Sequence, residues 1–240
     1  MNNKKIVTII AACVLGVTAF AQVGESRSGL RIGVTSGLSL NSIDFDPTVK
    51  QRSHTGLNCG IALKYVCEKY FKTLCSLQAE LNYARLGWNE DILSYSGSKL
   101  PDTYQRHMNY IQLPLLANLG WGRETKGMMF YIVAGPQVGY CISESSQRSE
   151  QWTVDAAGNP DRPNNMYEQY NLEIKNRLDY GITAGAGLEL NTSHLGHFTL
   201  EARYYYGLGD VFGNSKKDVF SRSANNTVTV KLGYYIDVTK

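Results

Sequence analysis

The side chains best suited to proton transfer in this chain are four histidines, His54, His107, His194 and His197. A hydrolase needs such a base within hydrogen-bond reach of a nucleophile, and a carboxylate that orients the base. No spacing of Ser, His and Asp or Glu indicates that arrangement, and no phosphate-binding glycine loop, zinc motif or nucleophile elbow is found. We therefore predict no enzyme, with no catalytic residue, cofactor or metal. A lipid hydrolase at an outer rim, using His54 or His107 with Ser and Glu, is the alternative.

Acidic residues that could bind calcium lie in segments that we expect to be loops. Carboxylate oxygens are preferred Ca²⁺ ligands, but a loop site needs a pattern such as Asp-x-Asp-x-Asp-Gly, which is missing from this sequence. We interpret these residues as solvated loop charges. They are Asp91, Asp102, Glu144, Glu150, Asp155, Asp161 and Glu168.

The cysteines do not follow the spacing of metal ligands either. Cys67 and Cys75 flank a predicted turn and share one face of the strands that it joins. Two interpretations stay open at this point. The pair can form a disulfide in an oxidising compartment, or each cysteine can be a separate small apolar side chain.

Composition excludes several classes of protein. The 24 Lys and Arg against 21 Asp and Glu give a net charge of +3 without a basic stripe, so we predict no nucleic-acid partner. The mean hydropathy of −0.26 argues against a helical membrane protein, as does the lack of a long apolar run beyond the N-terminal segment. Strands that are apolar on one face only are compatible with both observations.

Eight segments alternate between apolar and polar residues. The clearest runs from Leu178 to Leu190, where every even position is apolar and every odd position between them is polar or Gly. Successive side chains of a strand point to opposite faces, so this period of two predicts strands with one apolar and one polar face. The eight segments are about 30–40, 56–66, 74–88, 108–119, 128–141, 178–190, 198–206 and 227–238.

The connections between these segments decide which face is inside. The short ones, about 67–73, 120–127 and 191–196, alternate with long ones, about 41–55, 89–107, 142–177 and 208–226. Outer-membrane barrels combine tight periplasmic turns with long outer loops, whereas a soluble sandwich has no reason to sort loops in this way. We therefore predict an all-β fold, an eight-stranded antiparallel up-and-down transmembrane β-barrel in the cell outer membrane. Its apolar face contacts outer-membrane lipid.

The N-terminal segment predicts export. Lys4 and Lys5 precede a short apolar run, and Ala19-Phe20-Ala21 resembles a cleavage site. We expect residues 1–21 to be a signal peptide and residues 22–240 to form a single barrel domain. An even number of strands places both ends of that domain on the periplasmic side.

The polar face carries charges of both signs in nearly equal numbers. A lumen of eight strands is narrow and filled by side chains, so opposite charges can neutralise one another there. The predicted lumen network consists of Arg31, Lys64, Glu80, Asp179, Glu189, Glu201, Arg203, Lys231 and Asp237.

Aromatic residues at the strand ends predict two girdles at the membrane interfaces. The periplasmic girdle is Tyr65, Trp121, Phe130, Phe198 and Tyr234. The outer girdle is Tyr83, Trp88, Tyr140 and Tyr204 to Tyr206.

Four motifs resemble the PorT-like outer-membrane β-barrel family of Bacteroidota. They are Gly33-Val34-Thr35-Ser36-Gly37-Leu38-Ser39-Leu40, Leu77-Gln78-Ala79-Glu80-Leu81-Asn82-Tyr83, Tyr110-Ile111-Gln112-Leu113-Pro114-Leu115-Leu116 and Ala134-Gly135-Pro136-Gln137-Val138-Gly139. They build a barrel and specify no activity, although the resemblance implies that some members serve protein secretion. The long connection 142–177 and the terminal Thr239-Lys240 depart from the family pattern.

The connection 142–177 is the best candidate for recognition, with Trp152, Tyr167 and Tyr170 among Asn, Asp, Gly and Pro. Long loops on a rigid scaffold usually carry function. We therefore predict a structural, adhesion or recognition role without a small-molecule substrate. The alternatives are an accessory barrel of a secretion system, with other envelope proteins as partners, and a small-solute pore.

Overall fold

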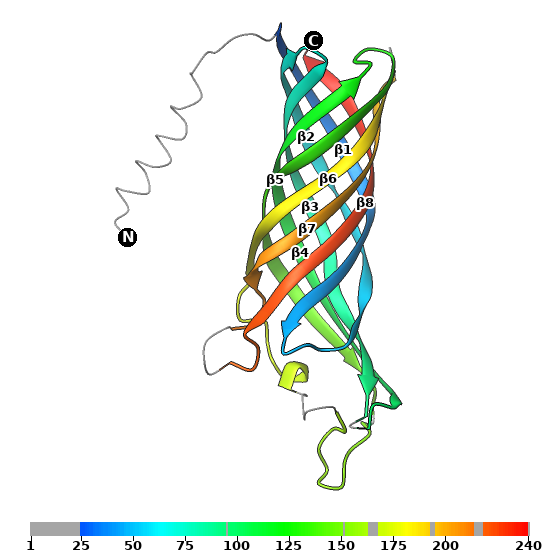
Figure 1. Cartoon of the computed structure of the whole chain (residues 1–240), viewed down its shortest axis with the longest axis vertical. Helices are drawn as coiled ribbons and strands as arrows, with labels where there is room; N and C mark the ends of the chain where they lie inside the picture. The colour runs from blue at the N-terminus through cyan, green and yellow to red at the C-terminus, as the bar shows by residue number, and fades with distance from the viewer. Residues whose placement is uncertain are drawn as a thin grey trace, which may run out of the picture.

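A computed structural model of the chain describes residues 25–94, 96–150, 152–162, 168–192, 195–213 and 218–239 (Figure 1). The predicted signal peptide 1–21 lies outside these residues, as do Tyr167 and His194. Among the residues described, no helix is long and apolar enough to cross a membrane. The elements are β1 Glu25–Asp46, β2 Gln51–Tyr70, β3 Thr73–Leu93, β4 Lys99–Gly122, β5 Gly127–Arg148, the 3₁₀ turn η3 Glu168–Tyr170, β6 Leu178–Thr192, β7 Gly196–Asp210 and β8 Arg222–Thr239.

The eight strands form a closed antiparallel barrel in sequence order, and β8 pairs with β1. The predicted up-and-down topology is therefore confirmed. The start of β1 and the end of β8 lie at one end, with the short turns, and the longer connections lie at the other (Figure 1). We call these the periplasmic end and the outer end. Closure leaves no strand edge facing lipid within the membrane.

The middle of the barrel turns apolar side chains outward and polar side chains inward. Leu188, Leu200 and Val230 point outward and remain 42–47% exposed, as they must to contact acyl chains. The five aromatic residues of the predicted periplasmic girdle also point outward. Trp121 stacks on Phe130, and Phe198 packs against Tyr234 at a tilt. This polarity is the reverse of a soluble barrel.

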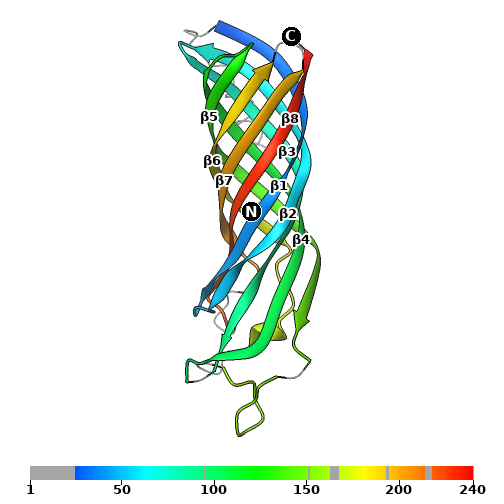
Figure 2. The same ribbon diagram turned by 90° about the vertical axis from the view of Figure 1, so that its right-hand side faces the viewer.

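Most strands next to a long connection extend farther than their alternation predicts; β6 is the exception and begins at Leu178, as predicted. β1 and β2 reach Asp46 and Gln51, β3 and β4 reach Leu93 and Lys99, and β5 continues to Arg148. Only 47–50, 94–98, 149–177 and 211–221 therefore lie outside the eight strands at the outer end. At this end, which is at the bottom of the view, strands β4 and β5 extend farther than β6 to β8 (Figure 2).

The extensions escaped prediction because their polarity is inverted. In β1 the buried side chains change from Ser39 and Asn41 to Ile43 and Phe45. The apolar positions thus switch from even to odd numbers, which ends the pattern used to recognise the strand. Above the membrane the outer surface meets water, so the apolar face must turn inward.

Two residues of the predicted outer girdle are wrong: Trp88 lies on an inverted extension, and Tyr205 lies on the inward face of β7 by the ordinary alternation of that strand. Trp88 is fully buried and Tyr205 is only 4% exposed, and both point into the barrel. Tyr140, Tyr204 and Tyr206 do face outward, at 40–52% exposure. Trp88 lies on the extension of β3, where water and not lipid surrounds the barrel.

Candidate functional site

A first cluster of charges closes the lumen around Glu80 of β3. Its carboxylate accepts hydrogen bonds from both terminal nitrogens of Arg203, at 2.6 and 3.0 Å, and from Lys231 Nζ at 2.6 Å. Glu201, next to Arg203 on the same face of β7, pairs with Arg203 Nε and accepts a hydrogen bond from Tyr131 Oη at 3.0 Å. The register places Glu201 directly opposite Lys231 of β8. Two anions and two cations are thus neutralised within the membrane.

Glycine makes this packing possible at one position in particular. A Cβ on Gly187 of β6 would lie 2.5 Å from the Tyr131 hydroxyl, well inside van der Waals contact. Without that atom the Tyr131 ring can cross the lumen and reach Glu201. A small residue on the inward face of β6 thus leaves space for a large side chain from β5.

A second cluster lies nearer the periplasmic end, around Glu189 of β6. Its two oxygens accept hydrogen bonds from Lys64 Nζ at 2.6 Å and Arg31 Nη1 at 2.8 Å. Arg31 Nε continues the chain to Asp237 at 3.0 Å, and Asp237 also lies 3.1 Å from His197 Nε2. His197, one of the four histidines considered for proton transfer, is buried within this cluster.

The nine residues predicted for the lumen network do not all lie in one cluster. Seven form the two clusters inside the barrel. Asp237 lies at the mouth, where its side chain is 36% exposed. Asp179 is separate, because within the described ranges no Lys or Arg pairs with it; Asn225 Nδ2 donates to it at 3.2 Å.

Little open space is left between the side chains. A cavity with a volume of about 20 Å³ lies beside Arg203, Lys231 and Tyr205. That space suits about one water molecule. The side chains at this level therefore pack closely around the cavity.

The outer end has a second core of the opposite character. Its residues are apolar, come from four strands and from the connections above them, and are almost completely buried. Phe45 packs edge-on against Trp88 with ring centroids 5.3 Å apart, and it contacts Phe212 and Phe220. We call this group the outer core: Ile43, Phe45, Val49, Ala84, Leu86, Trp88, Ile92, Tyr104, Met108, Tyr110, Cys141, Tyr170, Ile174, Val211, Phe212 and Phe220.

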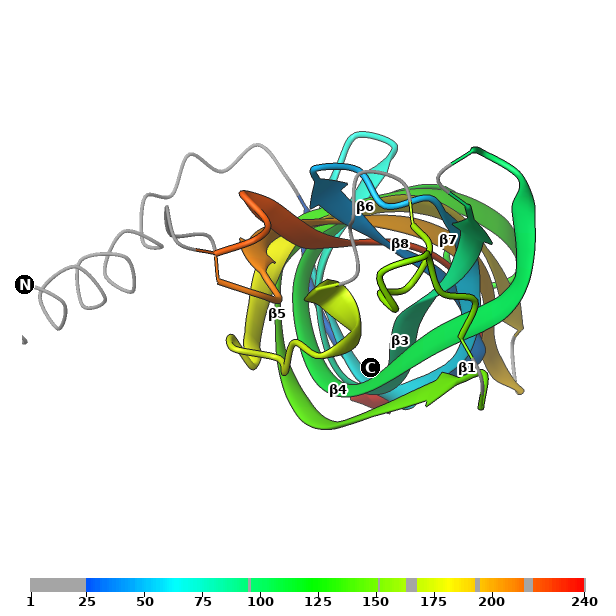
Figure 3. The ribbon, with the colours of Figure 1, turned by 90° about the horizontal axis from the view of Figure 1, so that it is seen from below.

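The connection between β5 and β6 caps this core. Arg162 lies over the Trp152 ring, 4.7 Å from its centroid, and donates to Tyr170 Oη at 2.9 Å and to Asp102 at 3.1 Å. Tyr170 Oη in turn donates to Glu90 Oε2 at 2.8 Å. Seen from the outer end, η3 and its neighbours lie across the barrel opening (Figure 3). The long connection is therefore a lid anchored by buried charges.

The predicted recognition residues Trp152 and Tyr170 pack into this lid. Tyr170 is only 9% exposed and its ring contacts Tyr104, 4.8 Å between centroids. Their use in binding a partner stays a prediction. Several of the loop acids also have ion-pair partners, since Asp91 pairs with Arg52, Asp102 with Arg162 and Glu144 with Arg106.

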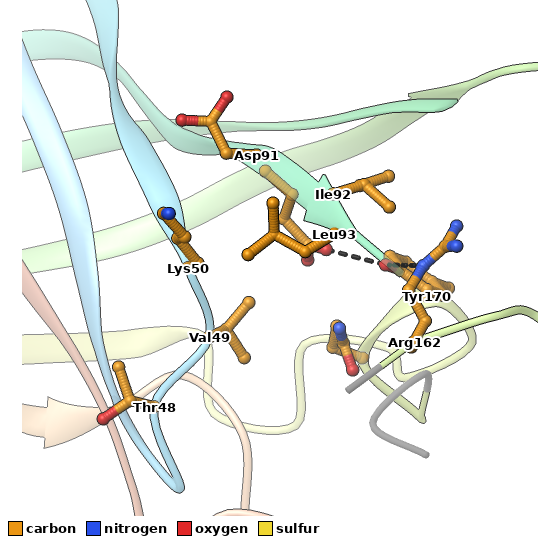
Figure 4. A pocket seen from close by; sticks show the side chains of 10 residues that line it. Thr48, Val49, Lys50, Asp91, Ile92, Leu93, Arg162 and Tyr170 are labelled. Atoms are coloured by element: carbon orange, nitrogen blue, oxygen red, sulfur yellow. Dashed lines mark hydrogen bonds between the residues drawn. The ribbon is translucent and has the colours of Figure 1, made fainter. Parts of the chain in front are cut away.

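A pocket of about 240 Å³ opens beside the lid. The β1–β2 connection forms one wall and the end of β3 the other, with Arg162 and Tyr170 pointing in from the lid (Figure 4). Lys50 and Asp91 lie at its edge, while Val49, Ile92 and Leu93 supply apolar contacts. This pocket is large enough to hold a small molecule or one side chain of a partner.

Burial raises the pKa of the Glu90 carboxyl in this pocket, in spite of its hydrogen bond from Tyr170 and the nearby Arg162. A carboxyl whose pKa is higher in the folded state stabilises that state at low pH, and the contribution is lost as the pH rises through the folded pKa. We expect the melting temperature of the outer end to fall between mildly acidic and mildly alkaline pH. Glu90→Gln keeps an acceptor for Tyr170 and should flatten that dependence, measured by tryptophan fluorescence. Equal slopes for both proteins would contradict the assignment.

The outward apolar face of this closed barrel agrees with the comparison to known protein families. The sequence model of the outer membrane protein β-barrel domain matches residues 20–213. The chain belongs to this family. The protein is therefore an integral β-barrel of the outer membrane.

Solved structures resemble this outer-membrane barrel in fold. Ail of Yersinia pestis, solved with the heparin analogue sucrose octasulfate, is 16% identical, with a TM-score of 0.38 over 88% of this chain and 100% of that one. Neisserial surface protein A is 10% identical, with a TM-score of 0.42 over 85% and 96%. OprG of Pseudomonas aeruginosa is 14% identical, with a TM-score of 0.37 over 89% and 98%. No curated protein sequence matches the chain significantly.

Proposed function

We propose that the protein is a non-catalytic scaffold of the outer membrane, closed to solutes, that holds a rigid recognition surface above the lipid. The observation that carries this proposal is the closure of the barrel at two levels. The ion clusters around Glu80 and Glu189 fill the lumen, and the lid and outer core close the opening above them. A barrel used for transport would need an aqueous path through both.

The experiment that tests this proposal is conductance in planar lipid bilayers. We expect the full-length mature protein to insert without stable channel openings, because buried charge pairs resist separation. A porin of known conductance in the same bilayers serves as the positive control. Reproducible unitary steps from the wild-type protein would contradict the scaffold and favour a small-solute pore.

An accessory role in protein secretion is the second candidate, and it would place the chain in the PorT-like branch that four of its motifs resemble. Strand β5 pairs with β4 as far as Arg148, but with β6 only as far as Tyr140. Within the described residues, 142–148 thus lack a strand neighbour on one side, and an exposed strand edge can pair with an extended segment of a partner. Loss of cargo export on gene deletion, with an intact membrane barrier, would support this role.

The absence of enzymatic activity belongs to the same proposal. The His54 and His107 rings pack against each other at a tilt of 58°, with ring nitrogens 3.3 Å apart, and both side chains are buried. We expect lipid A mass spectra to be identical with and without the protein. New or missing acyl chains or phosphates would point to a lipid-modifying enzyme instead.

A further inference from the structure

A groove of about 510 Å³ lies on the outside of the barrel, where β5, β6 and β7 approach the outer end. It exists because β6 begins at Leu178 whereas β5 continues to Arg148, so the wall of the barrel is incomplete above that point. The residues that matter here are Tyr140, Leu178, Tyr180, Leu208, Lys175 and Arg177.

The lower part of the groove belongs to the lipid-facing belt. Tyr140, Leu178, Tyr180 and Leu208 all point outward and are 47–55% exposed. At the same level the register between β4 and β5 shifts, because Tyr110 pairs with Cys141 but Asn109 pairs with Ser143, and the inward side chain of Cys141 already belongs to the outer core. The groove therefore spans the depth at which acyl chains give way to headgroups.

The upper part of the groove is basic. Arg177 is exposed, and among the described residues its guanidinium has neither an ion pair nor a hydrogen bond. Lys175 pairs with Asp218 at 3.2 Å, but its side chain is 60% exposed, so the pair is weak. The acidic member of the lining, Asp210, accepts a hydrogen bond from the backbone amide of Ser223 at 2.6 Å.

The backbone that carries Arg177 is held in place. Its carbonyl accepts a hydrogen bond from the Cys141 amide at 2.8 Å, which joins the segment to β5. The Asn176 side chain donates to the carbonyl oxygens of Asp210 and Phe212, at 2.9 and 3.2 Å, which joins it to the end of β7 and the connection beyond. The cation is thus presented on a fixed segment.

We propose that this groove binds the phosphorylated headgroup of a lipid of the outer leaflet. Arg177 contacts the phosphate, because a guanidinium matches phosphate oxygens in a bidentate arrangement, and Lys175 adds a second positive charge. Tyr140 and Tyr180 pack against the first acyl carbons, where amphipathic rings are favoured. The outer leaflet supplies this chemistry at the depth of the groove, and basic pockets at a membrane interface recognise lipid headgroups.

The test is binding of phosphorylated lipid A to the detergent-solubilised full-length protein, followed by native mass spectrometry. We expect Arg177→Gln to weaken binding about 10-fold or more, as expected for the loss of a hydrogen bond to a charged group. Arg148→Gln is the matched control, because Arg148 is an exposed arginine at the end of β5, outside the groove. It should bind as the wild type does. Both variants should keep the heat-modifiable gel shift of a folded barrel.

Two further arms identify the ligand. Lipid A from which the phosphates have been removed should bind about as weakly to the wild type as phosphorylated lipid A binds to Arg177→Gln. Inorganic phosphate at millimolar concentration should leave the bound lipid in place. Equal binding of the two lipids, equal binding by Arg177→Gln and the wild type, or displacement by inorganic phosphate would each overturn the proposal.

Discussion

Arg203→Met should lower the free energy of unfolding of the barrel by about 3–5 kcal/mol. The substitution removes the cation that Glu80 and Glu201 share, and both carboxylates are buried. Among the described residues, Lys231 is then the remaining cation that pairs with Glu80. The hydrophobic side chain fills similar space, so the loss is chiefly electrostatic. The measurements are the temperature at which the heat-modifiable gel shift disappears and urea unfolding in lipid vesicles.

The matched control is Arg52→Met, which removes an arginine from the surface. Arg52 pairs with Asp91, but its side chain is 67% exposed, and such pairs contribute about 0–1 kcal/mol. Adding Glu201→Gln to Arg203→Met should recover part of the lost stability, because one uncompensated charge is then removed. Equal gel-shift temperatures for Arg203→Met and the wild type would mean that the cluster is solvated.

Trp88→Ala should destabilise the outer end by about 3–5 kcal/mol, the usual cost of removing a large buried aromatic side chain. Trp88 is fully buried in the outer core, between Phe45, Phe212 and the guanidinium of Arg106. We expect proteolysis of the outer connections to accelerate while the membrane-embedded half keeps its gel shift. The measurement is limited proteolysis of the protein in vesicles.

Trp121→Ala provides the comparison for this prediction. Trp121 faces outward near the periplasmic end and is 37% exposed, so its loss should not change proteolysis at the outer end. Quenchers attached to acyl chains should reduce the fluorescence of a variant that retains only Trp121, and should leave a variant that retains only Trp88 unaffected. Strong quenching of Trp88 fluorescence would contradict its burial and would mean that Trp88 faces the lipid.

The sequence allowed the membrane half to be predicted, because lipid enforces a strict period of two. Leu188 and Leu200 must face acyl chains while Glu189 and Glu201 must not, so the sequence of each strand shows which of its faces points toward the lipid. The pairing of these charges was less accessible. Glu80 lies 123 residues from Arg203 in sequence, and only barrel closure and stagger bring the two together.

The outer half was missed for a physical reason that the sequence nevertheless records. In β1 the apolar residues change from Leu38 and Leu40 to Ile43 and Phe45, and so shift from even to odd positions. A search for one continuous alternation ends the strand there, whereas a search that allows one change of parity would have extended it. The role of Arg162 carried no such signal, since it depends on contacts of the lid.

Inversion of polarity also sets how far the protein extends from the cell. From Ala84 to Leu93, β3 continues beyond the change of parity, which at ordinary strand rise and tilt corresponds to about 25 Å above the acyl chains. The Arg162 pocket therefore stands clear of the headgroups. A ligand of this pocket must therefore come from the medium or be part of a sugar chain that is long enough to reach the pocket.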